Sequence, residues 1–155
     1  MARPSRERID SLLVEDDPGE ARLIEEAFGE LRMPIDVHTV TDVAAAIEYL
    51  ERRAASPEGL PDIIFLDLGL PGPSGWTLLD DLKERNLSGV ESIPVIVITN
   101  SQAQDDMFDS LDDDQVRAYF TKPYNPGEYV DLAQSLVEFL AREQDSHERT
   151  SESLS

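Results

Sequence analysis

Five polar side chains follow short apolar segments of the chain and could together bind a phosphoryl group. They are Glu15, Asp16, Asp67, Thr99 and Lys122. Carboxylates that meet in one crevice raise each other's pKa values or recruit a cation. An oxygen-rich site without histidine or cysteine favours magnesium. Because the lysine adds positive charge and the threonine adds a hydroxyl donor, the set is typical of a phosphoryl site.

Asp67 is the predicted acceptor of that group. A carboxylate can act as a nucleophile and become an acyl phosphate. Asp67 directly follows Ile63–Leu66, a continuous apolar run without alternation. Such a run is expected in a strand that is covered on both faces. Asp67 therefore ends the most buried predicted strand, which makes it the natural nucleophile among the acids.

The segments that position these side chains alternate between predicted strands and predicted helices. Strands are expected at 9–14, 35–40, 63–66, 95–98 and 116–120. Apolar residues at helical spacing predict helices that open at Pro18, after Thr41 or Asp42, near Trp76, at Gln102 and at Asn125-Pro126. This order implies an α/β fold, a doubly wound five-stranded parallel sheet with helices on both faces. In such sheets ligands bind at the carboxyl ends of the strands, where the polar residues fall.

Several of these residues have a structural interpretation beside the functional one. Asp67 could be a structural acid, Thr99 a residue that merely ends a strand, and Tyr119 a packing residue. Asp17 precedes the helix that opens at Pro18, so we interpret it as a helix cap rather than a metal ligand. Asn125 is interpreted in the same way for the last helix.

Composition limits the possible functions. The 155 residues fit one domain, and the absence of cysteine excludes disulfides, thiolate metal sites and cysteine nucleophiles. The chain has 33 acidic residues against 13 lysines and arginines, a net charge of −20. Such a surface repels nucleic-acid backbones and anionic lipids, so neither is an expected partner. With Lys83 and Lys122 as the only lysines, the charge suggests a halophilic, high-salt cytoplasm, or else a protein that is simply acidic.

The predicted domain covers residues 9–141, between an N-terminal tail at 1–8 and a charged, serine-rich tail at 142–155. We expect that second tail to be disordered. No apolar run approaches the length of a membrane span, and no apolar signal segment follows the arginine-rich start. A cytoplasmic location is the resulting expectation.

Four short motifs resemble one known family. They are Leu12–Gly19 (LLVEDDPG), Leu66-Asp67-Leu68 with Leu70-Pro71 and Gly75, Ile98–Ser101 (ITNS) and Tyr119–Pro123 (YFTKP). Each motif alone is weak, but the four in this order resemble the receiver domain of response regulators, with a CheY-like fold. The first motif and the long loop 54–61 look most like the small receivers that work with phytochrome-type histidine kinases.

The resemblance implies a role for each matching residue. Asp67 would be the phosphoacceptor, Asp16 a direct Mg²⁺ ligand, and Glu15 an acid that acts mainly through water. The main-chain carbonyl of Gly69 would complete the protein ligands, and Lys122 would pair with the phosphoryl oxygens.

Two further residues would transmit the change. Thr99 would turn toward the phosphoryl group, and Tyr119 would move inward with it. The resemblance also implies that the bond between Lys122 and Pro123 is often cis, which would aim the lysine into the site.

The implied function is a single-domain response regulator of a two-component phosphorelay. It would take a phosphoryl group from a histidine kinase and signal through another protein or through a homodimer. It would not be an enzyme beyond its own phosphorylation and dephosphorylation.

Two alternatives come from other functional classes. A receiver-like module that only binds partners would be expected to have lost an acid or the lysine. A magnesium-dependent aspartyl phosphatase usually has a second aspartate two residues after its nucleophile, where this chain has Gly69. Gly69 also lacks the side chain common in the family, and Ser74 stands where an aspartate is usual.

Overall fold

The structure, a computed structural model, describes residues 8–67, 75–85, 89–99 and 115–154. Gly69, Ser74 and the helix predicted from Gln102 lie outside the described residues. For Thr99 the backbone alone is described.

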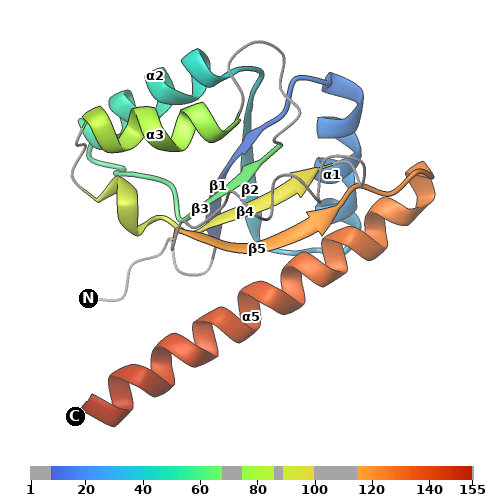
Figure 1. Cartoon of the computed structure of the whole chain (residues 1–155). Coiled ribbons are helices and arrows are strands. Elements are labelled where there is room, and N and C mark those ends of the chain that lie inside the picture. Colours follow the sequence, from blue (N-terminus) through green and yellow to red (C-terminus); the bar gives the residue numbers. More distant parts are fainter. Residues whose placement is uncertain (1–7, 68–74, 86–88, 100–114, 155) are drawn as a thin grey trace.

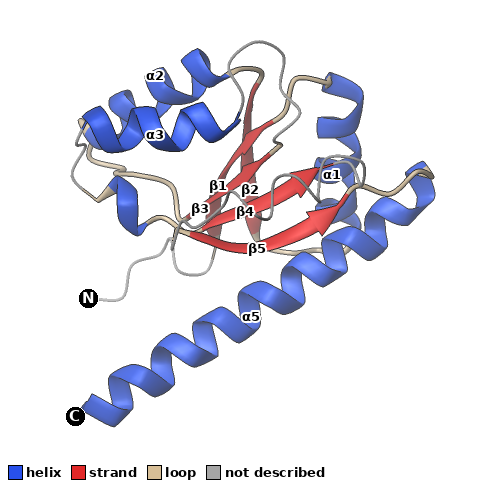
Figure 2. Cartoon of the chain, in the orientation of Figure 1, coloured by secondary structure: helices blue, strands red, loops and turns tan. Residues whose placement is uncertain are grey.

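The core of the fold is a parallel sheet of five strands in the order β2-β1-β3-β4-β5 (Figure 2). The strands are β1 (Ile9–Val14), β2 (Ile35–Val40), β3 (Ile63–Leu66), β4 (Val95–Thr99) and β5 (Val116–Thr121). All four neighbouring pairs are parallel. The predicted doubly wound sheet is confirmed, with each strand within one residue of its expected bounds.

Helices cover both faces of this sheet (Figure 1). They are α1 (Pro18–Glu30), α2 (Val43–Ala54), α3 (Gly75–Arg85) and α5 (Tyr129–Leu154), with two 3₁₀ turns at Val90–Ser92 and Pro126–Glu128. One face packs on α2 and α3 through side chains such as Leu12 and Ile64, and the other packs on α1 and α5 through Leu13 and Phe65. Neighbouring residues of one strand thus serve opposite cores, because side chains alternate along a strand.

Aspartates begin two of the helices, as the sequence indicates. The Asp17 side chain accepts hydrogen bonds from the backbone N–H groups of Gly19 and Glu20, at 2.8 and 3.3 Å. The Asp42 side chain accepts one from the N–H of Ala45 at 2.7 Å. Each bond satisfies an N–H that the first helical turn leaves without a partner. Asp17 is therefore the predicted cap, and Asp42, not Thr41, caps α2.

The last helix differs from its prediction at both ends. The Asn125 side chain accepts no capping bond; its amide donates to Glu128 Oε1 at 2.8 Å, and a 3₁₀ turn precedes α5. At the other end, α5 continues to Leu154, through the segment from residue 142 that the sequence predicts as a tail (Figure 1). The polar composition suggested disorder, but 129–154 contains no proline or glycine to break the helix. No helix in the described part of the chain is long and apolar enough to cross a membrane.

Register brings the polar residues of the first and third strands to one edge. Val14 lies opposite Leu66, and the Asp67 N–H donates to the Val14 carbonyl at 3.1 Å. Glu15 and Asp67, the next residues of the two strands, therefore lie side by side. On the other side of β3, Leu66 pairs with Val97, and Thr99 at the end of β4 pairs with Thr121. Lys122 directly follows Thr121, so the carboxyl ends of β1, β3 and β5 supply the charged side chains of one site.

Candidate phosphoryl site

Three carboxylates converge at the carboxyl end of the sheet. Glu15, Asp16 and Asp67 each place an oxygen within 4.8 Å of the other two. Glu15 and Asp67 are buried, at 1% and 4% exposure, whereas Asp16 is exposed. The structure therefore brings together the three acids predicted from the sequence, with one open side toward solvent.

Lys122 lies among these acids and is itself buried. Its Nζ donates to Asp67 Oδ2 at 2.9 Å and lies 2.7 Å from Glu15 Oε1. Both carboxylates come from strands far from Lys122 in the sequence, so only the folded sheet creates these pairs. A buried ammonium needs such partners, because an unpaired charge away from water is strongly unfavourable.

The two carboxylate oxygens of Glu15 differ in their hydrogen bonding. Its Oε2 accepts the Asp17 N–H at 3.1 Å, but its Oε1, although close to Lys122, accepts no well-directed hydrogen bond from the described residues. A buried acceptor left in this way is unusual, and it lies in a cluster of hard oxygen donors. The donor set therefore fits a divalent cation.

The burial of these groups changes their protonation. Burial raises the pKa of Glu15 to about 8, the negative charge of Asp67 adds to this, and nearby Lys122 offsets it only in part. Burial also opposes the charge on Lys122, but its contacts with Asp67 and Glu15 outweigh that effect and raise the pKa of the ammonium. Lys122 thus stays charged, and a cation at the cluster would favour the ionised form of Glu15.

Glu20, in the first turn of α1, is a site residue that the sequence analysis missed. Its Oε2 accepts a hydrogen bond from Lys122 Nζ at 3.1 Å. An acid in a first helical turn is usually explained by the helix dipole, so its type alone carries no signal. The available clue was its place, three residues after the cap Asp17, on a helix that starts at the site.

The remaining predicted residues are only partly placed. Thr99 ends β4 and pairs with Thr121, next to Lys122. Tyr119 is half-buried on β5 and packs with Val116 against the core under α2 and α3. The expected cis bond at Lys122 is wrong, since the described residues contain no cis peptide bond and Lys122 reaches Asp67 with a trans one.

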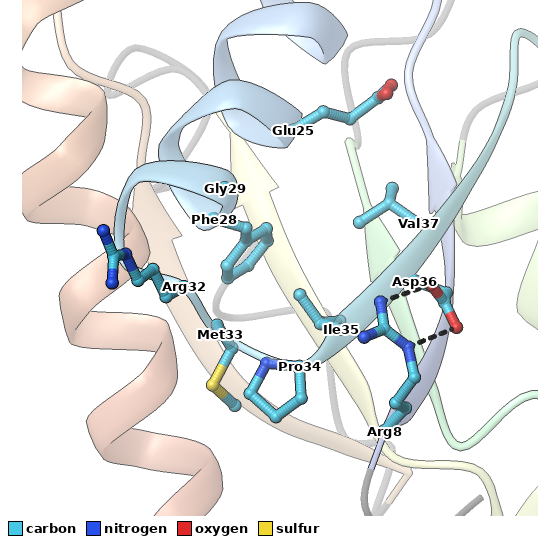
Figure 3. A pocket seen from close by; sticks show the side chains of 10 residues that line it. All are labelled: Arg8, Glu25, Phe28, Gly29, Arg32, Met33, Pro34, Ile35, Asp36 and Val37. Atoms are coloured by element: carbon cyan, nitrogen blue, oxygen red, sulfur yellow. Dashed lines mark hydrogen bonds and ion pairs between the residues drawn. The ribbon is translucent and has the colours of Figure 1, made fainter.

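A pocket of about 460 Å³ lies at the opposite end of the sheet, between the end of α1 and the start of β2 (Figure 3). Phe28, Met33 and Ile35 line its apolar part. Arg8 at its rim forms a two-contact ion pair with Asp36, at 2.7 and 3.1 Å. The pocket is not one of the predicted sites, and the charges of Arg8 and Asp36 neutralise each other.

Comparison with known proteins assigns the chain and its fold to one family. The family model of the response regulator receiver domain matches residues 11–134. The probable methanogenesis regulatory protein FilR2 of Methanothrix harundinacea is 32% identical, over 82% of this chain and 78% of that protein. Response regulator Rcp1 of Synechocystis is 30% identical, over 83% of this chain and 86% of that protein.

Solved structures agree with this assignment. The phosphorylated cyanobacterial phytochrome response regulator RcpA superposes with a TM-score of 0.70 at 33% identity, over 85% of this chain and 93% of that one. The Mn²⁺-bound form of Rcp1 superposes with a TM-score of 0.69 at 28% identity, over 85% and 94%. Because fold and sequence agree over most of its length, the chain belongs to the response regulator receiver domain family of two-component systems.

Proposed function

We propose that Asp67 is the phosphoacceptor of this receiver and that Mg²⁺ is its cofactor. The observation that carries the proposal is the position of Asp67 at the end of β3, beside both Lys122 and the acids Glu15 and Asp16. A buried carboxylate with a lysine at 2.9 Å and a cation-binding cluster next to it has the surroundings that phosphoryl transfer requires.

The proposed reaction is an in-line displacement at phosphorus. An Asp67 carboxylate oxygen forms the new bond to phosphorus, while the bond from phosphorus to the histidine nitrogen of the kinase breaks and its electron pair stays on that nitrogen. Lys122 places its charge next to the acceptor oxygen and the arriving phosphoryl oxygens. The Thr99 hydroxyl is proposed to donate to the same group.

Glu15, Asp16 and Asp67 would hold the Mg²⁺, together with the main-chain carbonyl of Gly69. When bound, the ion supplies positive charge that offsets the charge on the phosphoryl oxygens. Rcp1, a similar receiver, has been solved in an Mn²⁺-bound form, which supports a divalent ion here.

The signal is proposed to pass from Asp67 through Thr99 and Tyr119 to the surface around β4 and β5. Receivers work with sensor histidine kinases, and the similarity to RcpA and Rcp1 supports a phytochrome-type kinase as this chain's partner. Output through a protein partner or a homodimer, and a cytoplasmic location, remain predictions from the sequence.

Intact-mass spectrometry after incubation with acetyl phosphate and Mg²⁺ tests the proposal. Wild type should gain the mass of one phosphoryl group, and Asp67→Asn should gain none. Asp80→Asn, an exposed aspartate of α3, is the matched control and should behave as wild type. No gain in wild type would sink the proposal and favour the unphosphorylated binding module, and a gain in Asp67→Asn would move the acceptor elsewhere.

A further inference from the structure

We infer that Glu20 is a positioning residue that holds Lys122 in place for phosphoryl transfer, an inference that rests on the proposed phosphorylation of Asp67. Glu20 lies on α1, outside the acidic cluster, and its Oε2 accepts from Lys122 Nζ at 3.1 Å. The contact joins the first turn of α1 to the residue that directly follows β5.

The donors of Lys122 explain why a third carboxylate matters. An ammonium has three N–H donors and no acceptor. Among the described residues its well-directed bonds go to Asp67 and Glu20, while Glu15 is close but poorly aligned. Glu15 and Asp67 both belong to the cluster that fits a divalent cation, so they must share their charge with it. Glu20 lies outside that cluster, so it is the partner of Lys122 that the cation would not share.

The position of Glu20 is itself well supported. Its backbone N–H donates to the cap Asp17, and α1 packs against α5 through the buried residues of one core. A lysine side chain is long and flexible, so an acceptor on a rigid element restricts where its ammonium lies. With one N–H on Glu20, the rest of the ammonium lies against Asp67 and Glu15.

This arrangement predicts a symmetrical kinetic effect. Phosphorylation forms the bond between Asp67 and phosphorus; loss of the group breaks it as water attacks phosphorus and inorganic phosphate leaves. Both steps place charge on the same phosphoryl oxygens, which Lys122 stabilises. Glu20→Gln should therefore slow both steps by about two- to fivefold, the scale of a partly exposed ion pair.

The experiment compares wild type, Glu20→Gln and Glu26→Gln. Glu26 is an exposed acid on the same helix, where it pairs with Arg22, so its variant removes the same charge away from the site. Intact mass follows phosphorylation by acetyl phosphate with Mg²⁺, then decay after the donor is removed. Glu20→Gln should slow both rates, while Glu26→Gln should match wild type.

A metal-free measurement provides an independent readout. Lys122 and Lys83 are the only lysines, and Lys83 is exposed, so it serves as an internal reference for acetylation by limiting acetic anhydride. Loss of the Glu20 contact should raise the labelling of Lys122 relative to Lys83 by about two- to fivefold. Glu20→Asp keeps the charge but shortens the reach, so it should also slow both rates.

The outcomes separate this inference from the function on which it rests. Unphosphorylated wild type would overturn the proposed function and the inference with it. If wild type is phosphorylated, the inference alone is overturned by unchanged or increased rates in Glu20→Gln, by equal losses in Glu26→Gln, or by unchanged Lys122 labelling. Wild-type rates in Glu20→Asp would assign the effect to charge alone and would also overturn positioning.

Discussion

An exposed ion pair at the amino end of the sheet contrasts with buried charges at the carboxyl end. At the amino end, Arg8 and Asp36 form a two-contact pair whose side chains are 56% and 64% exposed. At the carboxyl end, the side chains of Lys122, Glu15 and Asp67 are 3%, 1% and 5% exposed. Exposed pairs contribute little to stability, whereas buried charges must offset a large loss of hydration.

The difference shows that the carboxyl end is not built for stability. Two acids, Glu15 and Asp67, are buried there beside one lysine, and burial, to which the charge of Asp67 adds, raises the pKa of Glu15. A well-packed apolar cluster would stabilise the fold more. Such a charged site is expected where function requires it, as in binding a cation and a phosphoryl group.

The largest expected difference between the ends comes from removing the cation at each. Lys122→Met leaves buried carboxylates without their partner, so the metal-free protein should lose about 3–5 kcal/mol of unfolding free energy. Arg8→Met should lose less than about 1 kcal/mol, because the Arg8–Asp36 pair is exposed and Asp36 stays hydrated without its partner. Urea unfolding with a chelator present measures both losses. Equal losses would show that the two ends are alike.

A smaller effect of opposite sign is expected for Glu15. Glu15→Gln keeps the shape of the side chain and stays neutral at every pH, whereas the buried Glu15 must retain a proton that it releases on unfolding, so the metal-free protein should gain about 1–3 kcal/mol near pH 7. The same variant should bind Mg²⁺ about 10- to 100-fold more weakly. Urea unfolding and calorimetric titration test these effects. A destabilised variant with unchanged Mg²⁺ affinity would contradict both.

The pH dependence of this gain sharpens the comparison further. The folded pKa of Glu15, about 8, lies above its ordinary value of 4.5, so between these pH values the folded state binds the extra proton. Wild-type stability should therefore fall relative to Glu15→Gln as pH rises from 5 to 8, by at most about 1.4 kcal/mol per pH unit, and then level off. Unfolding curves at each pH give the difference. A difference that stays flat would mean that Glu15 is ionised throughout.

The smallest expected effect is the response of the amino end to salt. The loss caused by Arg8→Met, small at low ionic strength, should shrink further at about 1 M salt, where the Debye length falls to about 3 Å. The loss caused by Lys122→Met should persist, because its pairs are shielded from solvent. Unfolding at two salt concentrations tests this. Parallel salt responses would indicate that the site is hydrated.

Much of the fold could be predicted because its signals are local. Apolar runs such as Ile63–Leu66 identified the buried strands, and Asp17 before Pro18 identified a helix start. Their alternation permits few topologies other than a doubly wound sheet. The end of α5 had no such local signal, because a polar segment without breakers is compatible with both a helix and a disordered tail.

The sequence by itself determined which residue types stand at the strand ends. It therefore determined that three acids and a lysine could meet at one edge of the sheet. The tertiary structure alone decided which of their atoms are close. The contact between Glu20 and Lys122 joins residues 102 positions apart, and the hydrogen bonding of the two Glu15 oxygens depends on the directions of neighbouring groups. The physical reason is that type and order are properties of the chain, whereas burial, pairing and pKa depend on neighbours that only folding brings together.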